Sequence, residues 1–288
     1  MKNYSSFYKG KEIALATMHH KELYLSSSCK KILGASLYPL NETINTDLLG
    51  TFSSEIERKG SQKETALKKC HMGLELSGLL LSLASEGSFG PHPHIPFLST
   101  SLETLVFVDK INQIEIFQSK RFTTTNYAQI TCSNACDITE FLKRCKFPSH
   151  GLIIRPNIWD DKTILFKGIQ DILDLKKHLS FCCSASLDGK AHIETDMRAH
   201  MNPTRGFTIC KLGILLFRRL TRLCPSCSSP GWDRTDIKKG KPCLLCNYPS
   251  ALPVSYVWSC SKCPHTEEQP IKNESAFAPP EYCDMCNP

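Results

Sequence analysis

Four Cys-x-x-Cys pairs lie in the last 65 residues of this 288-residue chain and account for eight of its 16 cysteines. Two thiolates separated by two residues form a turn, here termed a knuckle, and two knuckles complete a tetrahedral shell of four sulfurs around zinc. We therefore predict two Zn²⁺ ions with a structural role, because four protein sulfurs per ion leave no open position for water. The pairs are Cys224 and Cys227, Cys243 and Cys246, Cys260 and Cys263, and Cys283 and Cys286.

The sequence leaves open which knuckles share an ion. Adjacent knuckles can pair, first with second and third with fourth, or the pairing can be interleaved. We favour the sequential order, since each half of the segment then resembles one zinc-ribbon hairpin. The gap of 15 residues between the first two pairs is ordinary for such a ribbon.

The alternative to metal ligation is four disulfides, which form in exported proteins. Residues 1–10 contain no apolar stretch of the kind that a secretory signal carries. No segment of the sequence reaches the roughly 18 apolar residues of a membrane span. We therefore expect a cytoplasmic protein without a membrane segment, in which the cysteine pairs are metal ligands.

Charge is distributed unevenly along the chain, whose formal net charge is +7. Residues 1–223 contain 29 Lys and Arg against 21 Asp and Glu, whereas residues 224–288 contain six against seven. Eight thiolates on two Zn²⁺ would add about −4 to this tail, which makes it a poor match for a phosphate backbone and disfavours nucleic acid binding. We interpret the basic run before the tail as a solvated helix face. The run comprises Arg205, Lys211, Arg218, Arg219 and Arg222.

The first 223 residues alternate between short apolar runs and segments with helical spacing, which predicts one α/β domain with a single core. We expect a mixed sheet with flanking helices, followed by a small zinc-ribbon module at 224–288. Ser61 and Glu64 form a capping-box pattern that predicts the start of a helix. The expected strands are 12–17, 36–40, 79–84, 104–109, 114–117 and 151–155, and the expected helices are 21–33, 61–78, 137–146 and 203–223.

Three segments between these elements are rich in polar side chains. Residues 17–22 follow the first strand and open the first helix, which suits an anion site made from a helix N-terminus, a Thr hydroxyl and a Lys ammonium. Residues 85–94 are expected as a loop that places Glu86 at a strand end beside two glycines, where ligands bind in α/β sheets. Residues 194–205 gather two acids, two arginines and a histidine, a density that favours a site.

Two resemblances rest on these segments. The motifs ATMHHKE, ASEGSFGPHP and ETDMRAHMNPTR, with the cysteine knuckles, resemble an uncharacterised bacterial protein family over nearly the whole chain. Residues 12–118 resemble, more weakly, the inosine-triphosphate pyrophosphatase and Maf-like superfamily, although an Asn usual in its phosphate loop is absent and its acidic loop offers one carboxylate where many relatives have two. The matching residues are Ala16, Thr17 and Lys21, then Glu64, Ala66 and Lys68, then Ser85, Glu86 and Gly87.

The second resemblance implies a pyrophosphatase-like fold and a metal-dependent hydrolase. Mg²⁺ or Mn²⁺ held by Glu64 and Glu86 would bridge phosphate oxygens and activate water. The enzyme would release pyrophosphate from a nucleoside triphosphate or a related phosphoanhydride, with Asp196 as a further catalytic carboxylate at the rim. The residues expected to bind phosphate are Thr17, His19, Lys21, Arg198 and Arg205.

Two other functions remain open, both without catalysis. The chain could be a zinc-containing nucleic-acid-binding protein, for which binding should fall steeply with salt, or a protein-interaction protein built on the zinc module. Metal-dependent release of pyrophosphate would instead favour the hydrolase. We expect a nucleotide or another phosphorylated small molecule as the partner, while the sequence selects neither the base nor the oligomeric state.

Overall fold

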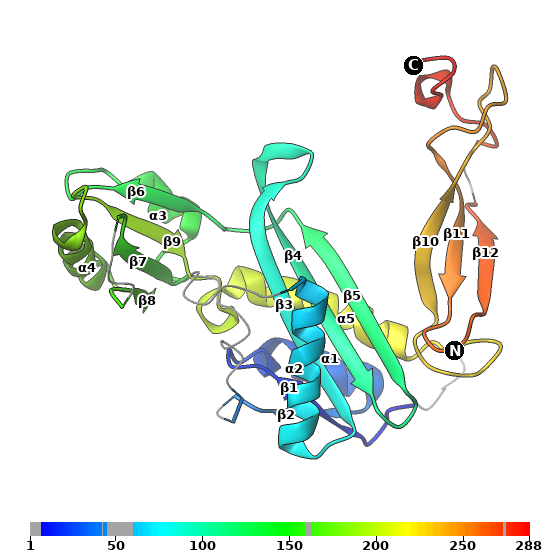
Figure 1. Cartoon of the computed structure of the whole chain (residues 1–288), viewed down its shortest axis with the longest axis horizontal. Helices are drawn as coiled ribbons and strands as arrows, with labels where there is room; N and C mark the ends of the chain where they lie inside the picture. The colour runs from blue at the N-terminus through cyan, green and yellow to red at the C-terminus, as the bar shows by residue number, and fades with distance from the viewer. Residues whose placement is uncertain (1–6, 42, 45–59, 159–162, 273–274) are drawn as a thin grey trace.

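The computed structural model describes residues 7–41, 43–44, 60–158, 163–272 and 275–288. Within these ranges the chain forms a five-stranded, a four-stranded and a three-stranded sheet in succession (Figure 1). None of the helices in the described ranges is long and apolar enough to cross a membrane. The first sheet and its helices position most of the polar residues singled out above.

The first sheet is mixed, as the sequence predicts. Its strand order is β2-β1-β3-β4-β5, with β2 and β3 parallel to β1 on either side of it. The strands β3, β4 and β5 follow one another as antiparallel neighbours. The bounds are β1 (Glu12–Ala16), β2 (Ser36–Pro39), β3 (Leu81–His92), β4 (Ile95–Asp109) and β5 (Ile114–Phe122).

Helices cover both faces of the first sheet. Successive residues of β3 point to opposite faces, so that Leu83 packs in the core beneath α1 and α5 whereas Ala84 packs in the core beneath α2. Figure 1 shows α2 lying across one face, with α1 and α5 behind the sheet. These helices are α1 (Glu22–Leu33), α2 (Gln62–Ser77) and α5 (Pro203–Leu220).

Local signals set the ends of α1 and α2. The predicted capping box is present, because Ser61 Oγ accepts the Glu64 N–H at 3.3 Å and Glu64 Oε2 accepts the Ser61 N–H at 2.8 Å. Gly34 and Gly78 end the two helices in the left-handed conformation, with φ of 67° and 68°. Both helices therefore start and stop close to where the sequence predicts.

A second sheet with its own core is inserted between β5 and α5. Its strand order is β6-β9-β7-β8, all antiparallel, and its core includes Phe141, Ile154 and Cys182. This finding corrects the expectation of a single core in residues 1–223, and its strands of four or five residues explain why periodicity missed most of them. The elements are β6 (Gln129–Cys132), α3 (Thr139–Cys145), β7 (Leu152–Pro156), β8 (Phe166–Ile169), α4 (Ile172–Ala185) and β9 (Ala191–Thr195), followed by the 3₁₀ helix η2 (Ala199–Met201).

The segment 85–94, expected as a ligand loop, is instead the outer part of the β3–β4 hairpin. Backbone pairing continues from Ser85 opposite Leu105 to Pro91 opposite Ser99. Figure 1 shows this hairpin extending well beyond the other strands of the sheet. Polar residues and glycines conceal the strand, since they lack the apolar alternation by which strands are recognised. Glu86 therefore lies within a strand rather than beyond its end.

The third sheet is an antiparallel β-meander in the C-terminal tail. Its order is β10-β11-β12, and β10 is exposed along nearly its whole length. Because these side chains are exposed, the sheet gains little hydrophobic stabilisation and requires another source of stability. The strands are β10 (Asp233–Lys239), β11 (Pro253–Ser259) and β12 (Thr266–Pro270), and the 3₁₀ helix η3 (Pro280–Tyr282) follows.

Candidate metal centres and a candidate anion site

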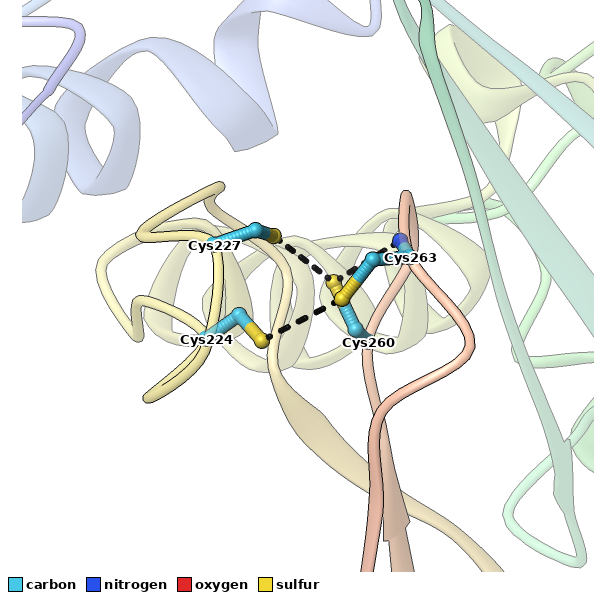
Figure 2. A group of neighbouring side chains, drawn as sticks. All are labelled: Cys224, Cys227, Cys260 and Cys263. Carbon is cyan, nitrogen blue, oxygen red and sulfur yellow. Dashed lines mark hydrogen bonds between the residues drawn. The ribbon is translucent and has the colours of Figure 1, made fainter.

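Four cysteines converge at one end of the third sheet, as Figure 2 shows. Cys224 Sγ lies 3.8 Å from Cys263 Sγ, and Cys227 Sγ lies 3.6 Å from Cys260 Sγ. A tetrahedral zinc ion with Zn–S bonds of about 2.3 Å places its sulfurs about 3.8 Å apart. A disulfide would bring two sulfurs to about 2.0 Å, so these four thiols, termed the proximal cluster, have the spacing of metal ligands.

A second group of four cysteines, termed the distal cluster, has the same geometry at the other end of the sheet. Cys243 Sγ lies 3.8 Å from Cys286 Sγ, and Cys246 Sγ lies 3.5 Å from Cys283 Sγ. Within each cluster all four sulfurs lie within 4.8 Å of one another. Each cluster could therefore hold one zinc ion.

Backbone geometry around the sulfurs also fits thiolate ligands. Cys260 Sγ accepts the N–H groups of Lys262 and Cys263 at 3.3 and 3.4 Å, and Cys243 Sγ accepts the Leu245 N–H at 3.4 Å. Ser228 and Asn247, which follow the first two knuckles, adopt positive φ angles of 57° and 59°. These turns aim backbone donors at sulfur, which stabilises the negative charge that metal binding requires.

The observed pairing corrects the sequential order favoured from the sequence. The first knuckle joins the third, and the second joins the fourth. The meander of the third sheet explains this order. The strands β10, β11 and β12 connect successive knuckles, and the chain reverses direction from each strand to the next. Odd-numbered knuckles therefore meet at one end of the sheet and even-numbered knuckles at the other. The strands β10 and β12 carry no apolar alternation, so the sequence alone does not predict this order.

The proximal cluster rests against the first sheet. Arg219 at the end of α5 donates to the Phe117 carbonyl at 3.2 Å and to the Gly231 carbonyl at 3.1 Å. Arg222 forms an ion pair with Asp233 at the start of β10. Two arginines of the basic run therefore attach the tail to the α/β body, rather than forming a wholly solvated face.

A cluster of buried charged side chains lies between the first sheet and its helices. Lys69 Nζ donates to Glu86 Oε2 at 2.6 Å, and Arg205 Nε donates to Glu103 Oε1 at 2.9 Å. Lys21 adds a fifth charge that interacts electrostatically with both pairs. All five residues, termed the ionic cluster, are at most 7% exposed. The cluster therefore buries three cations with two carboxylates, and one positive charge is left over.

Lys21 carries the charge that is left over. Among the described residues, its ammonium has one hydrogen bond, a long one of 3.4 Å to the Ser85 carbonyl, and no carboxylate at ion-pair distance. Burial is the main cause that lowers the pKa of Lys21 to about 7, and the neighbouring charges of Arg205 and Lys69 lower it further. A buried ammonium with unused donors is costly unless it serves a ligand.

Arg205 is occupied by other contacts, which argues against the phosphate-binding role expected for it. Its guanidinium holds Glu103 with two hydrogen bonds, of 2.9 and 3.3 Å, and so ties α5 to β4. A Cβ atom at Gly87 would lie 2.6 Å from Arg205 Nη2 and 2.8 Å from Glu103 Oε1. The glycine is therefore required beside this ion pair, and Arg205 positions the cluster rather than gripping phosphate.

Asp196 and Arg198 form an ion pair within their own segment. Arg198 Nη2 donates to Asp196 Oδ2 at 2.6 Å, and Arg198 Nε donates to Asp196 Oδ1 at 3.0 Å. Asp196 is fully buried, whereas the Arg198 side chain is 24% exposed. The carboxylate therefore fixes a guanidinium that still reaches the surface, and the roles predicted for the two residues remain predictions.

Glu64 and Glu86 have separate partners, which corrects their predicted sharing of Mg²⁺. Glu64 is exposed and completes the capping box with Ser61, while the buried Glu86 carboxylate is bound by the Lys69 ammonium. The start of α2 does approach β3 as expected, because Gln62 Nε2 donates to the Glu86 carbonyl at 3.1 Å. The Glu86 side chain, however, points toward Lys69, two turns further along α2.

The segment after β1 forms a turn that is closed by a side-chain hydrogen bond. Thr17 Oγ1 accepts the His19 N–H at 3.2 Å, and the Thr17 side chain is buried. The His19 ring lies 5.5 Å from the His200 ring, measured between centroids. Burial is the main cause that lowers the pKa of His19 far below its ordinary value, with the Lys21 charge second. Thr17, His19 and Lys21 therefore lie together at the carboxyl end of β1.

Sequence reasoning missed Lys69 and Glu103. Lys69 lies on the same face of α2 as the buried residues Ala66 and Gly73, and Glu103 has the same parity in β4 as the buried Leu105. A charge at a core-facing position of a periodic element is a usable signal, because such a charge needs a partner.

Comparison with known proteins gives one family. A family model described as a domain of unknown function, DUF6671, matches residues 69–288. The matched range takes in the ionic-cluster residues from Lys69 onward and both cysteine clusters, but it begins after Lys21. No curated protein matches the chain.

Proposed function

The chain belongs to the DUF6671 family, and we propose that it binds the phosphates of a nucleotide or a related phosphorylated small molecule beside Lys21 and hydrolyses its phosphoanhydride. The observation that carries this proposal is the buried Lys21 ammonium in the ionic cluster, whose three N–H donors make one long hydrogen bond among the described residues. An anion is the ligand that would neutralise the excess positive charge there. The structure therefore favours a phosphate-binding role for the residues around Lys21.

A second unsatisfied group supports an anion at this place. Ser85 Oγ is buried and has no hydrogen-bond partner among the described residues, and the Ser85 carbonyl accepts from Lys21. Phosphate oxygens would accept hydrogen bonds from both the hydroxyl and the ammonium. Thr17 and the neutral imidazole of His19 would line the same loop.

The hydrolytic step follows from the same group of residues. Glu86 would accept a proton from the attacking water, which then adds to phosphorus as the anhydride bond breaks and the leaving phosphate departs. Lys21 would stabilise the charge that develops on the phosphoryl oxygens. In this proposal Mg²⁺ or Mn²⁺ arrives with the substrate phosphates, because Glu64 is engaged in its capping box and does not meet Glu86.

The test is a panel of canonical, deaminated and methylated nucleoside triphosphates with Mg²⁺ or Mn²⁺, assayed for pyrophosphate and phosphate. We expect hydrolysis of at least one substrate, a loss of about a hundredfold or more in Lys21→Met, and wild-type activity in Lys30→Met, which changes an exposed lysine of the same helix. Equal activity in Lys21→Met and the parent would exclude this site. The absence of turnover, with nucleotide binding that depends on Lys21, would leave a binding protein rather than an enzyme.

The cysteine clusters have a structural role in this proposal. Each would hold one Zn²⁺ through four sulfurs, with no position left for a substrate or water. The zinc ions would supply the stability that the exposed third sheet lacks. Elemental analysis should find two zinc ions per chain, and fewer than one would exclude this role.

A second candidate function, recognition of a protein partner, is favoured by the surface of the distal cluster. Its two knuckles enclose Leu244-Leu245 and Asp284-Met285, whereas the proximal knuckles enclose Pro225-Ser226 and Ser261-Lys262. The distal end is acidic, because it carries Glu281 and Asp284 and because four thiolates would outweigh the charge of one Zn²⁺. The partner would therefore be a protein segment with apolar and basic side chains. The exposed apolar residues there are Leu244, Leu245, Tyr248, Phe277, Tyr282 and Met285.

This second function is tested with peptides that share one apolar pattern but carry either lysine or glutamate. Binding of the lysine peptide should be lost in Leu245→Ser and kept in Ser226→Ala, an exposed position of a proximal knuckle. Equal binding of both peptides, or self-association of the protein that Leu245→Ser abolishes, would contradict the partner described here.

A further inference from the structure

Three polar atoms that have no hydrogen-bond partner among the described residues lie around His20 at the start of α1. They are Glu22 Oε2, Asn41 Oδ1 and His200 Nδ1, and each is shielded from solvent. The Asn41 amide orientation is fixed, because its Nδ2 donates to Glu22 Oε1 at 2.9 Å, which leaves the oxygen as the unsatisfied atom. Buried polar atoms are nearly always paired in folded proteins, so three such atoms in one place require an explanation.

The residues that carry these atoms meet around the His20 side chain. His20 Nδ1 lies 3.0 Å from Glu22 Oε1 and 3.4 Å from Asn41 Nδ2. The His200 ring stands almost perpendicular to the His20 ring, at 88°, with 5.8 Å between the ring centroids. Residues from the start of α1, the end of β2 and η2 therefore converge on one small region.

The backbone of His20 and its contact with Glu22 suit a ligand role. Its φ angle of 50° lies in the left-handed region, which few non-glycine residues adopt. Its Nδ1 lies 3.0 Å from Glu22 Oε1, so a ring nitrogen and a carboxylate oxygen, both common metal ligands, already face each other.

We propose that His20, Glu22, Asn41 and His200 bind one divalent metal ion, separate from the two cysteine clusters. A cation satisfies acceptor atoms that no donor reaches among the described residues. Two imidazoles with a carboxylate and an amide oxygen select Mn²⁺, Fe²⁺ or Zn²⁺ over Mg²⁺ and Ca²⁺, which prefer oxygen ligands throughout.

Metal binding requires His200 and the paired His20 and Glu22 to move closer together. Among the described residues only the two cysteine clusters bring three or more His, Cys, Asp or Glu ligand atoms within 4.8 Å of one another, so the His200 nitrogens lie beyond that distance from the paired His20 and Glu22. The His20 side chain is 53% exposed and can rotate at little cost, whereas Glu22 is 19% exposed and is held by Asn41. The exposed His20 ring can therefore turn toward His200 while Asn41 holds the Glu22 carboxylate.

The charges around the site agree with a cation. Glu22 supplies the negative charge, while the nearby Arg198 is neutralised by Asp196 and the Lys21 ammonium points toward Ser85. Among the described residues, three acceptor atoms near His20 lack a donor, whereas the neighbouring Lys21 ammonium has one long hydrogen bond. The metal site stands on its own contacts and does not depend on the proposed hydrolase.

The experiment measures Mn²⁺ binding by the full-length protein. A weak chelator first clears nitrogen and oxygen sites, and elemental analysis confirms that two zinc ions per chain remain on the cysteine clusters. Mn²⁺ is then titrated while electron paramagnetic resonance measures the free ion. We expect one bound Mn²⁺ per chain and an affinity at least about tenfold lower in Glu22→Gln and in His200→Ala.

Two exposed residues of the same types provide the controls, since Glu75→Gln and His94→Ala should bind Mn²⁺ as the parent does. Glu22→Gln keeps the size of the side chain, so it reports on the ligand even where His200→Ala disturbs folding. The absence of bound Mn²⁺, or unchanged affinity in Glu22→Gln, would overturn the proposal. Catalytic activity is not measured, so failure of the hydrolase proposal leaves this result intact.

Discussion

At the scale of single residues, the start of α1 gathers opposite kinds of unsatisfied chemistry. Lys21 presents a buried ammonium with one long hydrogen bond, while its neighbour Glu22 presents a buried carboxylate oxygen with none among the described residues. The two groups do not neutralise each other, because Lys21 points to Ser85 and Glu22 binds His20 and Asn41. Burying the Lys21 ammonium and the Glu22 carboxylate apart from each other lowers the stability of the folded protein. This loss is explained if each group binds a ligand.

Replacement of Lys21 by methionine should stabilise the first sheet while abolishing anion binding. Removing the extra cation leaves two cations with two carboxylates in the ionic cluster, and buried ions replaced by apolar side chains often raise stability by about 1–4 kcal/mol. The measurement is native-state hydrogen exchange of β1 and β3 amides without ligand, which reports on this sheet alone. Lys30→Met, on the exposed face of α1, should change the opening free energy by less than about 0.5 kcal/mol. Lower stability of Lys21→Met would show that the ammonium is satisfied in the free protein.

At the scale of elements, helix ends and apolar strands could be predicted and polar strands could not. The capping box at Ser61 and the terminating glycines Gly34 and Gly78 act through local geometry, so a short stretch of sequence defines them. The outer half of β3 and all of β10 are held by backbone pairing with neighbouring strands, and their side chains carry no apolar alternation. Part of the site was missed for the same reason, because Glu103 lies on a strand whose register with Gly87 is a tertiary property.

The packing of α1 against α5 gives a prediction at the scale of elements. A Cβ atom at Gly206 would lie 2.0 Å from the Tyr24 ring, so Gly206→Ala should force the helices apart. Overpacking of this kind costs about 1–3 kcal/mol, more than the gain of about 1 kcal/mol in helix propensity. Hydrogen exchange of α5 amides measures the net loss. The double variant Gly206→Ala, Tyr24→Leu should recover most of it, and equal losses in the single and double variants would show that the ring is not the obstacle.

At the scale of the whole molecule, the described residues form three sheets that are stabilised by different means. The first two sheets have separate apolar cores, whereas the third is exposed and has a cysteine cluster at each end. Loss of metal should therefore unfold the tail and spare the two α/β parts, apart from contacts such as Arg219 with Phe117. The proposed ligand sites lie in the first part, so zinc held by the two cysteine clusters would stabilise a module that does not itself contain the proposed chemistry.

The interleaved pairing of the knuckles predicts how many zinc ions each of two double variants retains. Cys227→Ser with Cys260→Ser removes two ligands of the proximal cluster and leaves the distal cluster complete, so one zinc ion per chain should remain. Cys227→Ser with Cys246→Ser removes a ligand from each cluster, and three sulfurs hold zinc far less tightly than four, so neither ion should survive a chelator. Sequential pairing would reverse the two outcomes, because Cys227 and Cys246 would then share an ion. Native mass spectrometry of both variants against the two-zinc parent decides between the arrangements, and retention of zinc only in the second variant would contradict the observed topology.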